Sequence, residues 1–483
     1  MPTEDQQPLI LSRDEHSLSR KKIDPDALKV LYRLHRSGYK AYLVGGGVRD
    51  LLLGKQPKDF DIGTDASPDT VRRLFRNSRI IGRRFKINHV YFKGNKIIEV
   101  TTFRAEVDSD EETEDVEPVV RDNQFGDDES DALRRDLTIN GLFYDISDYS
   151  IIDYVGGIQD LNDGIIRIIG EPERRIREDP VRMIRAVRHA ARTGFEIEPV
   201  TYNAIRDLAQ QIELSSPARV HEEVIRDLTG CHAREAFKLF DKTGLLPYLT
   251  PIISEAIQRD PKNVWKCLDH TLAQIDKMSA SVGPGSVGTY FAAMLVGVAG
   301  VEELRDRVPE SLADEVAPFF VESAGELAQY AALPEPLEKL ERASAPTLRG
   351  PVRRSSRKKV KKSDLRRTID ALYLPLQITR RERDVMEDAL RMRFAMITAT
   401  MSAEPDERQE ALRVIRKSPL FSAGLKLLRL TARGENAELL DEWESVSADR
   451  QHKSAKDVKR EKKKRTRRRR RRRKRSDRAD SEE

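Results

Sequence analysis

The spacing of apolar residues along the chain predicts a head of mixed helix and strand. Residues 26–37 carry Leu28, Val30, Leu31 and Leu34 at helical spacing, which indicates an amphipathic helix. Short apolar runs then predict three strands, at residues 41–44, 59–64 and 97–103. Between the first two strands, three consecutive glycines lead into a short helix over 48–53, with Gly54 as its C-terminal cap.

Helical spacing dominates the rest of the chain. The strand signals fade after Ile151, and helical patterns run from residue 178 to residue 444, with proline and glycine clusters near 281–288 and 343–352. A basic segment follows the second cluster, at residues 352–362. We therefore predict an α+β fold, in which the head is followed by an all-α neck and body.

These patterns predict five segments. They are a flexible leader (1–25), the head (26–155), a helical neck (156–240), a helical body (241–450) and a disordered basic tail (451–483). Within the head, residues 106–131 hold 13 carboxylates and one Arg, which is typical of a mobile loop.

The net charge of +6 conceals two oppositely charged parts. Residues 451–483 hold 18 Lys and Arg against 6 Asp and Glu, so the first 450 residues carry a net charge of −6. A block of like charge repels itself and neutralises phosphates. The tail therefore predicts a nucleic-acid-binding arm.

The composition excludes a fibrous or membrane-spanning protein. The longest apolar run, residues 290–301, is too short for a hydrocarbon layer of ~30 Å. The first residues lack the layout of a secretory signal. Only Cys231 and Cys267 occur, without metal-ligand spacing. We expect a cytoplasmic protein that binds no membrane and has no structural disulfide.

The segment KDFDIGT places two carboxylates two residues apart. In a strand, Asp59 and Asp61 would face the same side, while Phe60 and Ile62 pack into the core. Two carboxylates this close repel each other unless a cation lies between them. Mg²⁺ prefers such oxygen ligands. A strand edge with two independent, solvated carboxylates is the alternative, which the spacing alone favours.

The glycine turn upstream adds a candidate site for phosphate. Backbone N–H groups at the start of a helix favour an anion. Arg49 follows in the first turn of that helix, where its guanidinium can reach a triphosphate. The P-loop pattern is absent. A phosphate-binding turn twelve residues before a pair of carboxylates indicates nucleotide chemistry more strongly than either feature does separately.

Four segments resemble the superfamily of class II tRNA nucleotidyltransferases and bacterial poly(A) polymerases. They are LVGGGVRDLLLGKQPKDFDIGT (43–64), RRDLTINGLFYD (134–145), YVGGIQDLNDGIIRIIG (154–170) and REDPVRMIRAVRHAARTGF (177–195). The resemblance covers residues 42–197 and continues more weakly to about residue 446. It implies a polymerase-β-like nucleotidyltransferase head.

The resemblance also implies roles for individual residues. Asp59 and Asp61 would bind Mg²⁺, and Asp136 would be the third catalytic carboxylate, with Glu99 as the competing candidate. The residues implied to bind the nucleotide are Gly46, Arg49, Arg135, Asp179, Arg182, Arg185 and Arg188. In this superfamily two Mg²⁺ ions, about 3.5–4 Å apart, activate the RNA 3′-hydroxyl and stabilise the leaving pyrophosphate. Without the motifs, Asp136 would be interpreted as a helix cap and Arg135 as part of a salt bridge.

Asp179 and Arg182 are implied to read the incoming base. We expect Asp179 to cap a helix that begins at Pro180. A carboxylate accepts from an exocyclic amino group, and an arginine donates to the neighbouring ring nitrogen. Adenine and cytosine both match this pair, whereas guanine and uracil present the reverse pattern. On spacing alone, the arginines of this helix are an ordinary solvated basic face.

The segment IIGRRFKINHVYF (80–92) discriminates between the two enzymes of the superfamily. It resembles the signature of bacterial poly(A) polymerases, carried by Gly82, Arg83, Arg84, Phe85 and His89. The third glycine of the turn also resembles that branch, and we interpret it as a position where a Cβ does not fit. A basic tail suits heterogeneous RNA ends, because it neutralises phosphates regardless of sequence.

We therefore expect an adenylyltransferase that adds AMP from ATP to the 3′ ends of mRNA and of small or decaying RNAs. The alternatives are a CCA-adding tRNA nucleotidyltransferase and a non-catalytic RNA-binding protein. The charged motif positions match the superfamily, whereas Leu137, Gly141 and His189 depart from it. Association with an RNA-degradation machinery and the oligomeric state stay open.

Overall fold

The computed structural model describes residues 7–82, 86–105, 125–282, 286–298, 365, 369, 376–401, 405–433 and 437–447. The chain divides into two compact units, one formed by Met1–Glu223 with Glu235–Tyr248 and the other by Val224–Arg234 with Leu249–Glu483. This division differs from the boundary predicted after residue 240. Residues just beyond it stay with the first unit, where the Tyr202 hydroxyl donates to the Lys242 carbonyl at 2.7 Å.

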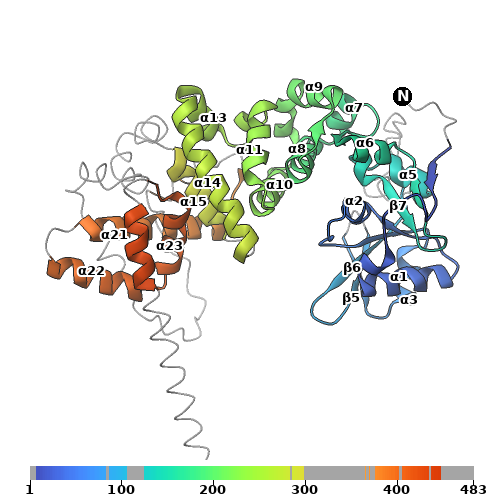
Figure 1. Ribbon diagram of the computed structural model, residues 1–483, viewed down its shortest axis with the longest axis horizontal. Helices are drawn as coiled ribbons and strands as arrows, with labels where there is room; N and C mark the ends of the chain where they lie inside the picture. Colours follow the sequence, from blue (N-terminus) through green and yellow to red (C-terminus); the bar gives the residue numbers. More distant parts are fainter. Residues whose placement is uncertain are drawn as a thin grey trace, which may run out of the picture. The chain divides into compact units, whose positions relative to one another are not determined.

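The head is built on one eight-stranded sheet (Figure 1). Its strands are β1 (Leu9–Leu11), β2 (Ala41–Val44), β3 (Asp61–Thr64), β4 (Ser78–Ile81), β5 (Ile87–Tyr91), β6 (Ile97–Thr102), β7 (Leu142–Asp145) and β8 (Ile151–Asp153). Their order across the sheet is β1-β8-β7-β2-β3-β6-β5-β4. The pair β3 and β6 is parallel, and the other neighbours are antiparallel. The strands predicted at 41–44 and 97–103 are confirmed.

Two helices cover the back of this sheet. Helix α1 (Pro25–Arg36) contacts β2 and β3, and α3 (Pro68–Leu74) contacts β4, β5 and β6. The side chains of α1 that carry the predicted helical spacing, Val30, Leu31 and Leu34, are fully buried. The helix begins where predicted because Asp24 accepts hydrogen bonds from two backbone N–H groups of its first turn and Pro25 has no N–H to leave unpaired.

Within the described part of the head, a hydrophobic cluster is packed on one part of the front of the sheet. A cluster of Tyr42, Val44, Phe103, Phe143 and Ile152 lies over β2, β7 and β8, together with Ala132 of α5 (Asp128–Leu133). The expected mobile loop at 106–131 is therefore wrong for its last residues. A capping box between Asp127 and Ser130 starts this helix. Residues 106–124 lie outside the described residues.

The first 25 residues do not form a flexible leader throughout. Strand β1 pairs antiparallel with β8, and the side chain of Leu18 is fully buried. The His16 ring forms a hydrogen bond of 2.8 Å with the Tyr149 carbonyl. Hydrogen bonding at the edge of the sheet and burial of apolar side chains hold this segment on the head.

The rest of the first unit is mainly helical, as expected. Its elements are η2 (Thr138–Asn140), α6 (Gly157–Asp163), β9 (Ile165–Ile166), α7 (Pro172–Glu178), α8 (Val181–Thr193), β10 (Glu196–Ile197), α9 (Pro199–Asp207), η3 (Ala209–Leu214), α11 (Ala233–Lys242) and α12 (Leu246–Leu249). The expectation that strands cease after Ile151 missed the parallel pair of β9 and β10. Helix α10 (Pro217–Thr229) is divided between the two units.

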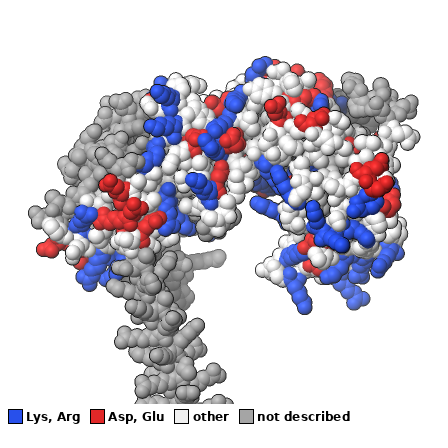
Figure 2. Space-filling model, in the orientation of Figure 1, with Lys and Arg blue, Asp and Glu red and all other residues white. Residues whose placement is uncertain are grey.

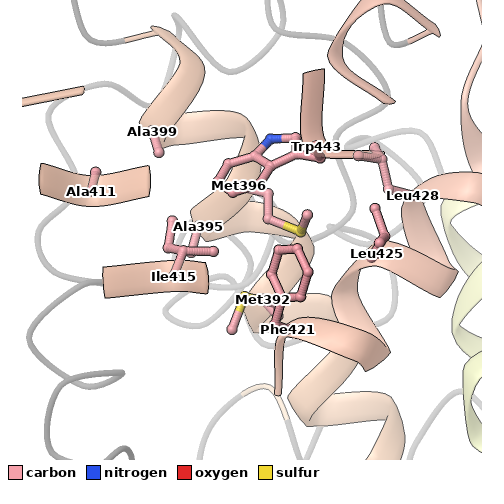
Figure 3. Packing of buried hydrophobic residues seen from close by; sticks show 10 residues of the cluster. All are labelled: Met392, Ala395, Met396, Ala399, Ala411, Ile415, Phe421, Leu425, Leu428 and Trp443. Atoms are coloured by element: carbon pink, nitrogen blue, oxygen red, sulfur yellow. The ribbon is translucent and has the colours of Figure 1, made fainter. Parts of the chain in front are cut away.

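The second unit is helical throughout its described part. Its labelled helices are α13 (Pro251–Arg259), α14 (Pro261–Val282), α15 (Val287–Val298), α21 (Arg380–Met401), α22 (Pro405–Lys417) and α23 (Phe421–Thr431). Trp443 is fully buried in a core with Met392, Met396 and Phe421 (Figure 3). The predicted interruption near 281–288 falls between α14 and α15. The basic segment at 352–362 and the tail at 451–483 lie outside the described residues.

The described segments contain no helix of the length and apolar character that a membrane span requires. In the same segments, Cys231 and Cys267 form no disulfide.

Candidate active site

Three carboxylates lie at or near the start of β3, namely Asp59, Asp61 and Glu99. Asp61 is the first residue of β3, and its register partner in the parallel strand β6 is Glu99. Burial raises the pKa of Asp61 to about 6, the charges of Glu99 and Asp59 add to this, and Arg135 acts in the opposite direction. The prediction that Asp59 also lies within the strand is wrong, because the strand starts two residues later.

Phe60 and Ile62, the apolar residues next to Asp59 and Asp61, are buried as expected. Phe60 is 7% exposed and Ile62 is fully buried. Their burial on the back of the sheet fixes the direction of Asp61 toward the front. The strand alternation predicted for this segment is thus confirmed from Asp61 onward.

The glycine turn lies directly beside Arg135. Gly45 has a φ of +70°, and a Cβ atom there would lie 3.0 Å from Nη1 of Arg135. Arg135 is held by an ion pair of 2.9 Å with Asp131 and by donation from Nη1 to the Asn140 carbonyl at 3.3 Å. Its guanidinium also lies 5.2 Å from the centre of the Phe143 ring. A fixed cation therefore lies beside the glycine turn and acts on the charge of Asp61.

Arg49 does not have the exposed position that a contact with a triphosphate requires. It lies in α2 (Gly46–Leu52), and it is only 1% exposed. Its guanidinium donates to Asp50 Oδ1 at 2.8 Å, to Asn140 Oδ1 at 2.5 Å and to His189 Nδ1 at 3.0 Å. This placement corrects the expectation from the sequence, since the side chain ties α2 to η2 and α8.

His189 accepts this bond as a neutral ring. Complete burial lowers the pKa of His189 well below its ordinary value, and the nearby arginines Arg49, Arg185, Arg188 and Arg192 lower it further. His189, where the sequence departs from the superfamily, therefore joins α8 to α2 through a hydrogen bond.

Asp179 has an unused hydrogen-bond acceptor. Its Oδ2 accepts from Arg219 at 2.7 Å, whereas its buried Oδ1 has no hydrogen-bond partner among the described residues. The expected side-chain cap is wrong: Pro180 precedes α8, and no side chain caps that helix. A buried acceptor without a partner is costly unless a ligand or water satisfies it.

Asp136 lies with the arginines of α8. Its two carboxylate oxygens pair with Nε of Arg182 at 3.2 Å and with Nη2 of Arg185 at 2.6 Å. Burial opposes the ionisation of Asp136, but Arg185 and Arg182 outweigh it and lower the pKa of the carboxyl. Asp136 is thus already charge-paired, which distinguishes it from Asp61 with its raised pKa.

Arg182 and Arg188 of α8 form further ion pairs and hydrogen bonds within the protein. Arg182 forms an ion pair of 3.0 Å with Glu178 and donates to the Arg175 carbonyl at 2.5 Å. Arg188 is 9% exposed and forms an ion pair with Glu223. Arg188 therefore belongs to the packing of α8 rather than to a surface that a nucleotide can reach.

Several residues that organise the site were not predicted. Asp131 could have been found, since it precedes Arg135 by four residues, the spacing at which helical side chains pair. Arg219 and Glu223 lie about 40 and 35 residues from their partners, Asp179 and Arg188. No local pattern connects residues so far apart in the sequence.

The carboxylates suit a hard cation by chemistry, although they are not gathered into a closed site. Across the segments that the structure describes, no group of three or more His, Cys, Asp or Glu side chains has the arrangement of a metal site. Asp59, Asp61 and Glu99 nevertheless offer oxygen ligands only, and burial, with a smaller contribution from the charges of Glu99 and Asp59, raises the pKa of Asp61.

The glycine turn, the paired carboxylates on parallel strands and the adjoining helices define a nucleotidyltransferase head. A solved tRNA-processing enzyme (apo form 2) shares the fold, with a TM-score of 0.50 and 22% identity over 85% of this chain and 93% of its own. Residues 41–167 match the family described as Poly A polymerase head domain, and residues 194–257 match a Probable RNA and SrmB-binding site of polymerase A. Residues 41–167 are therefore similar to the poly A polymerase head-domain family.

Curated relatives agree with this assignment. Poly(A) polymerase I of Salmonella typhimurium is 48% identical over 274 residues, which cover 56% of this chain and 58% of the relative. A CCA-adding enzyme of Lactobacillus helveticus is 38% identical over 219 residues, which cover 45% of this chain and 53% of that enzyme. The chain thus matches little more than half the length of these relatives and is more similar to the first.

Proposed function

We propose that the protein is a template-independent poly(A) polymerase that transfers AMP from ATP to RNA 3′ ends and releases pyrophosphate. The observation that carries the proposal is the register pairing of Asp61 with Glu99 beside Arg135 and the glycine turn. The choice of poly(A) rather than CCA addition is supported by the higher identity to Poly(A) polymerase I, 48% against 38%. We place the reaction in RNA 3′-end processing in the cytoplasm.

Glu99 is the better candidate for the third catalytic carboxylate. It lies beside Asp61 in the sheet and contributes to the raised pKa of Asp61, whereas Asp136 is neutralised by Arg182 and Arg185. We therefore assign Mg²⁺ binding to Asp59, Asp61 and Glu99. Bound Mg²⁺ would activate the 3′-hydroxyl and stabilise the charge that develops on the leaving pyrophosphate.

The protein's own groups orient the triphosphate. Helix α2 begins at Gly46 and presents the backbone N–H groups of its first turn, and Arg135 adds a positive charge that its ion pair with Asp131 keeps in place. Because these groups are fixed before the nucleotide binds, little reorganisation is needed when charge develops in the transition state.

Asp179 reads the base in this proposal. Its buried Oδ1 can accept a hydrogen bond but has no donor among the described residues. The exocyclic amino group of adenine can supply that donor. Arg182 donates to the neighbouring ring nitrogen, and Asp136 holds both Arg182 and Arg185 in place. Cytosine satisfies the same pair, so preference for ATP over CTP requires further contacts.

The decisive experiment offers the purified protein Mg²⁺, an unstructured RNA and each of the four nucleoside triphosphates separately. A long ladder with ATP alone is expected. Asp61→Ala should abolish it, whereas Asp69→Ala, which removes an exposed carboxylate of α3, should not. Addition that stops after C, C and A on a truncated tRNA would instead identify a CCA-adding enzyme. RNA binding without any addition would indicate a non-catalytic RNA-binding protein.

The segment 194–257 supports RNA as a partner, because it matches a family described as a probable RNA-binding site. We extend the proposal to an association with RNA-degradation machinery, which would bring decaying 3′ ends to the enzyme.

A further inference from the structure

Among the described residues, no helix or loop is packed on the front face of strands β4, β5 and β6, which lies next to the proposed catalytic carboxylates. The alternating side chains on the back, Ser78, Asn88, Val90, Ile98 and Val100, are at most 2% exposed. Those on the front are exposed or half-buried: Arg79, Ile81, His89, Tyr91 and Ile97. We call these five residues the front platform. Ile81 and Ile97 are each 42% exposed, so this face combines exposed apolar side chains with polar and aromatic ones.

The front platform continues the row of catalytic carboxylates. Asp61 pairs in register with Glu99, Glu99 with His89, and His89 with Arg79. Neighbouring strands lie about 4.8 Å apart, so the row extends over roughly 15 Å. His89 Nε2 lies 3.4 Å from Glu99 Oε1, which makes the platform and the catalytic row continuous.

The side chains of the front platform suit a single nucleic-acid strand. The Arg79 guanidinium lies 5.9 Å from the centre of the Tyr91 ring, and the rings of His89 and Tyr91 are 6.4 Å apart at 63°. Among the described residues, Arg79 forms no ion pair. Aromatic rings that stack bases and a cation that neutralises phosphate are the combination used for single strands without sequence preference.

The position of the front platform points to the RNA rather than the nucleotide. The glycine turn and Arg135 lie over β2 and β7, on one side of β3, whereas the platform lies on β6, β5 and β4, on its other side. In-line transfer needs the attacking hydroxyl and the leaving pyrophosphate on opposite sides of the reacting phosphorus. The two substrates should therefore approach the carboxylates from opposite sides.

We propose that the front platform is a subsite for the RNA segment just upstream of the 3′-terminal nucleotide, with Tyr91 stacking a base and Arg79 contacting a phosphate. The proposal rests on the proposed function, because it assumes that an RNA 3′ end is presented to Asp61 and Glu99. It adds residues that bind the primer strand and have no part in binding ATP.

The first test separates the two substrates kinetically. Tyr91→Ala and Arg79→Ala should each raise the KM for RNA about five-fold or more, and they should leave the KM for ATP within two-fold of the original. Tyr91→Phe and Arg79→Lys keep the ring and the charge and should restore most of the affinity for RNA. A rise in the KM for ATP instead, or an unchanged KM for RNA, would overturn the proposal.

The back of the sheet offers a matched control. The Arg36 guanidinium lies 5.8 Å from the centre of the Tyr32 ring on α1, and Lys and Arg gather over α1 and α3 (Figure 2). Arg36→Ala removes the same charge from a similar cation–aromatic pair in a basic region. It should leave the KM for RNA unchanged. An equal loss in Arg36→Ala and Arg79→Ala would show general electrostatic attraction and contradict a subsite.

The second test does not depend on catalysis or on variants that fold. RNA with 4-thiouridine at the position before its 3′-terminal nucleotide is cross-linked to the unaltered protein, and the attachment site is found by mass spectrometry. Cross-links to peptides of β4 and β5 support the front platform, and cross-links confined to other peptides overturn it. If the protein adds no AMP, the proposed function fails, whereas this cross-link still decides where RNA binds.

Discussion

Asp61 combines a half-buried carboxylate with two acidic neighbours. Burial, Glu99 and Asp59 together raise its pKa from 3.8 to about 6, and Arg135 limits the rise. Asp136, the other acidic residue that the motifs imply to be catalytic, has a lowered pKa because Arg185 and Arg182 pair with its carboxylate. The same residue type therefore has two different surroundings in this head: Asp61 has acidic neighbours, and Asp136 has two arginine partners.

The raised pKa of Asp61 predicts how stability depends on pH and Mg²⁺. A carboxyl with a raised pKa in the folded state stabilises the fold below pH 3.8 and loses this contribution as the pH rises through about 6. With a chelator present, the melting temperature should therefore decline over that range. Mg²⁺ should raise it at pH 7 and have little effect at pH 5, where Asp61 holds a proton.

Thermal denaturation across this pH range checks the prediction. Asp61→Asn should lose most of the response to Mg²⁺, while Asp69→Asn, an exposed carboxylate of α3, should keep it. A response to Mg²⁺ that is equally large at pH 5 and pH 7 would contradict the assignment of Asp61 as a ligand.

At the scale of elements, the glycines in the turn between β2 and α2 do not all meet the same structural requirement. Gly45 has a positive φ, and its missing side chain leaves room for Arg135. The interpretation that a Cβ does not fit at the third glycine is wrong. A Cβ on Gly47 would lie 3.6 Å from the Asp59 carbonyl and 3.7 Å from Leu43, which is ordinary contact.

Two alanine substitutions should therefore behave in opposite ways. Gly47→Ala lies in the first turn of α2 and should stabilise the head by about 0.5–1 kcal/mol, with adenylyl transfer retained. Gly45→Ala should destabilise it by about 1–2 kcal/mol, because alanine is strained at positive φ, and should also raise the KM for ATP by displacing Arg135. Urea denaturation and initial rates at varied ATP concentrations measure both effects. Similar losses in the two variants would refute this distinction.

The helices and strands themselves were largely predictable from local patterns. Helix α1 is confirmed because its apolar spacing and its Asp24–Pro25 start are both local signals. Strand β1 was missed because a three-residue strand has too few alternating positions to be recognised, and it exists only through its pairing with β8.

At the scale of the whole molecule, the candidate active site and the most basic segment lie in different parts of the chain. The candidate active site lies entirely within the first unit, whereas the 18 Lys and Arg of residues 451–483 belong to the stretch of sequence assigned to the second. Capture of RNA by phosphate neutralisation and selection of the nucleotide should therefore be separable.

Deletion of residues 451–483 tests this separation. Removal of a net charge of +12 should weaken RNA binding and make it less sensitive to salt, because fewer counterions are released. The preference among the four nucleoside triphosphates should not change. RNA binding is measured by fluorescence anisotropy at several salt concentrations, and altered nucleotide choice in the shortened protein would disprove the separation.

Local sequence was sufficient to indicate the α+β head, the helical body, the glycine turn and the acidic pair at Asp59 and Asp61, since each depends on residues a few positions apart. The choice between Glu99 and Asp136 required the register of β3 and β6, whose paired residues lie 38 positions apart. The burial of Arg49 against His189, 140 positions away, likewise arises only when helices pack. Spacing along a chain specifies which side chains share a face, but packing determines which faces meet and which charges are neutralised.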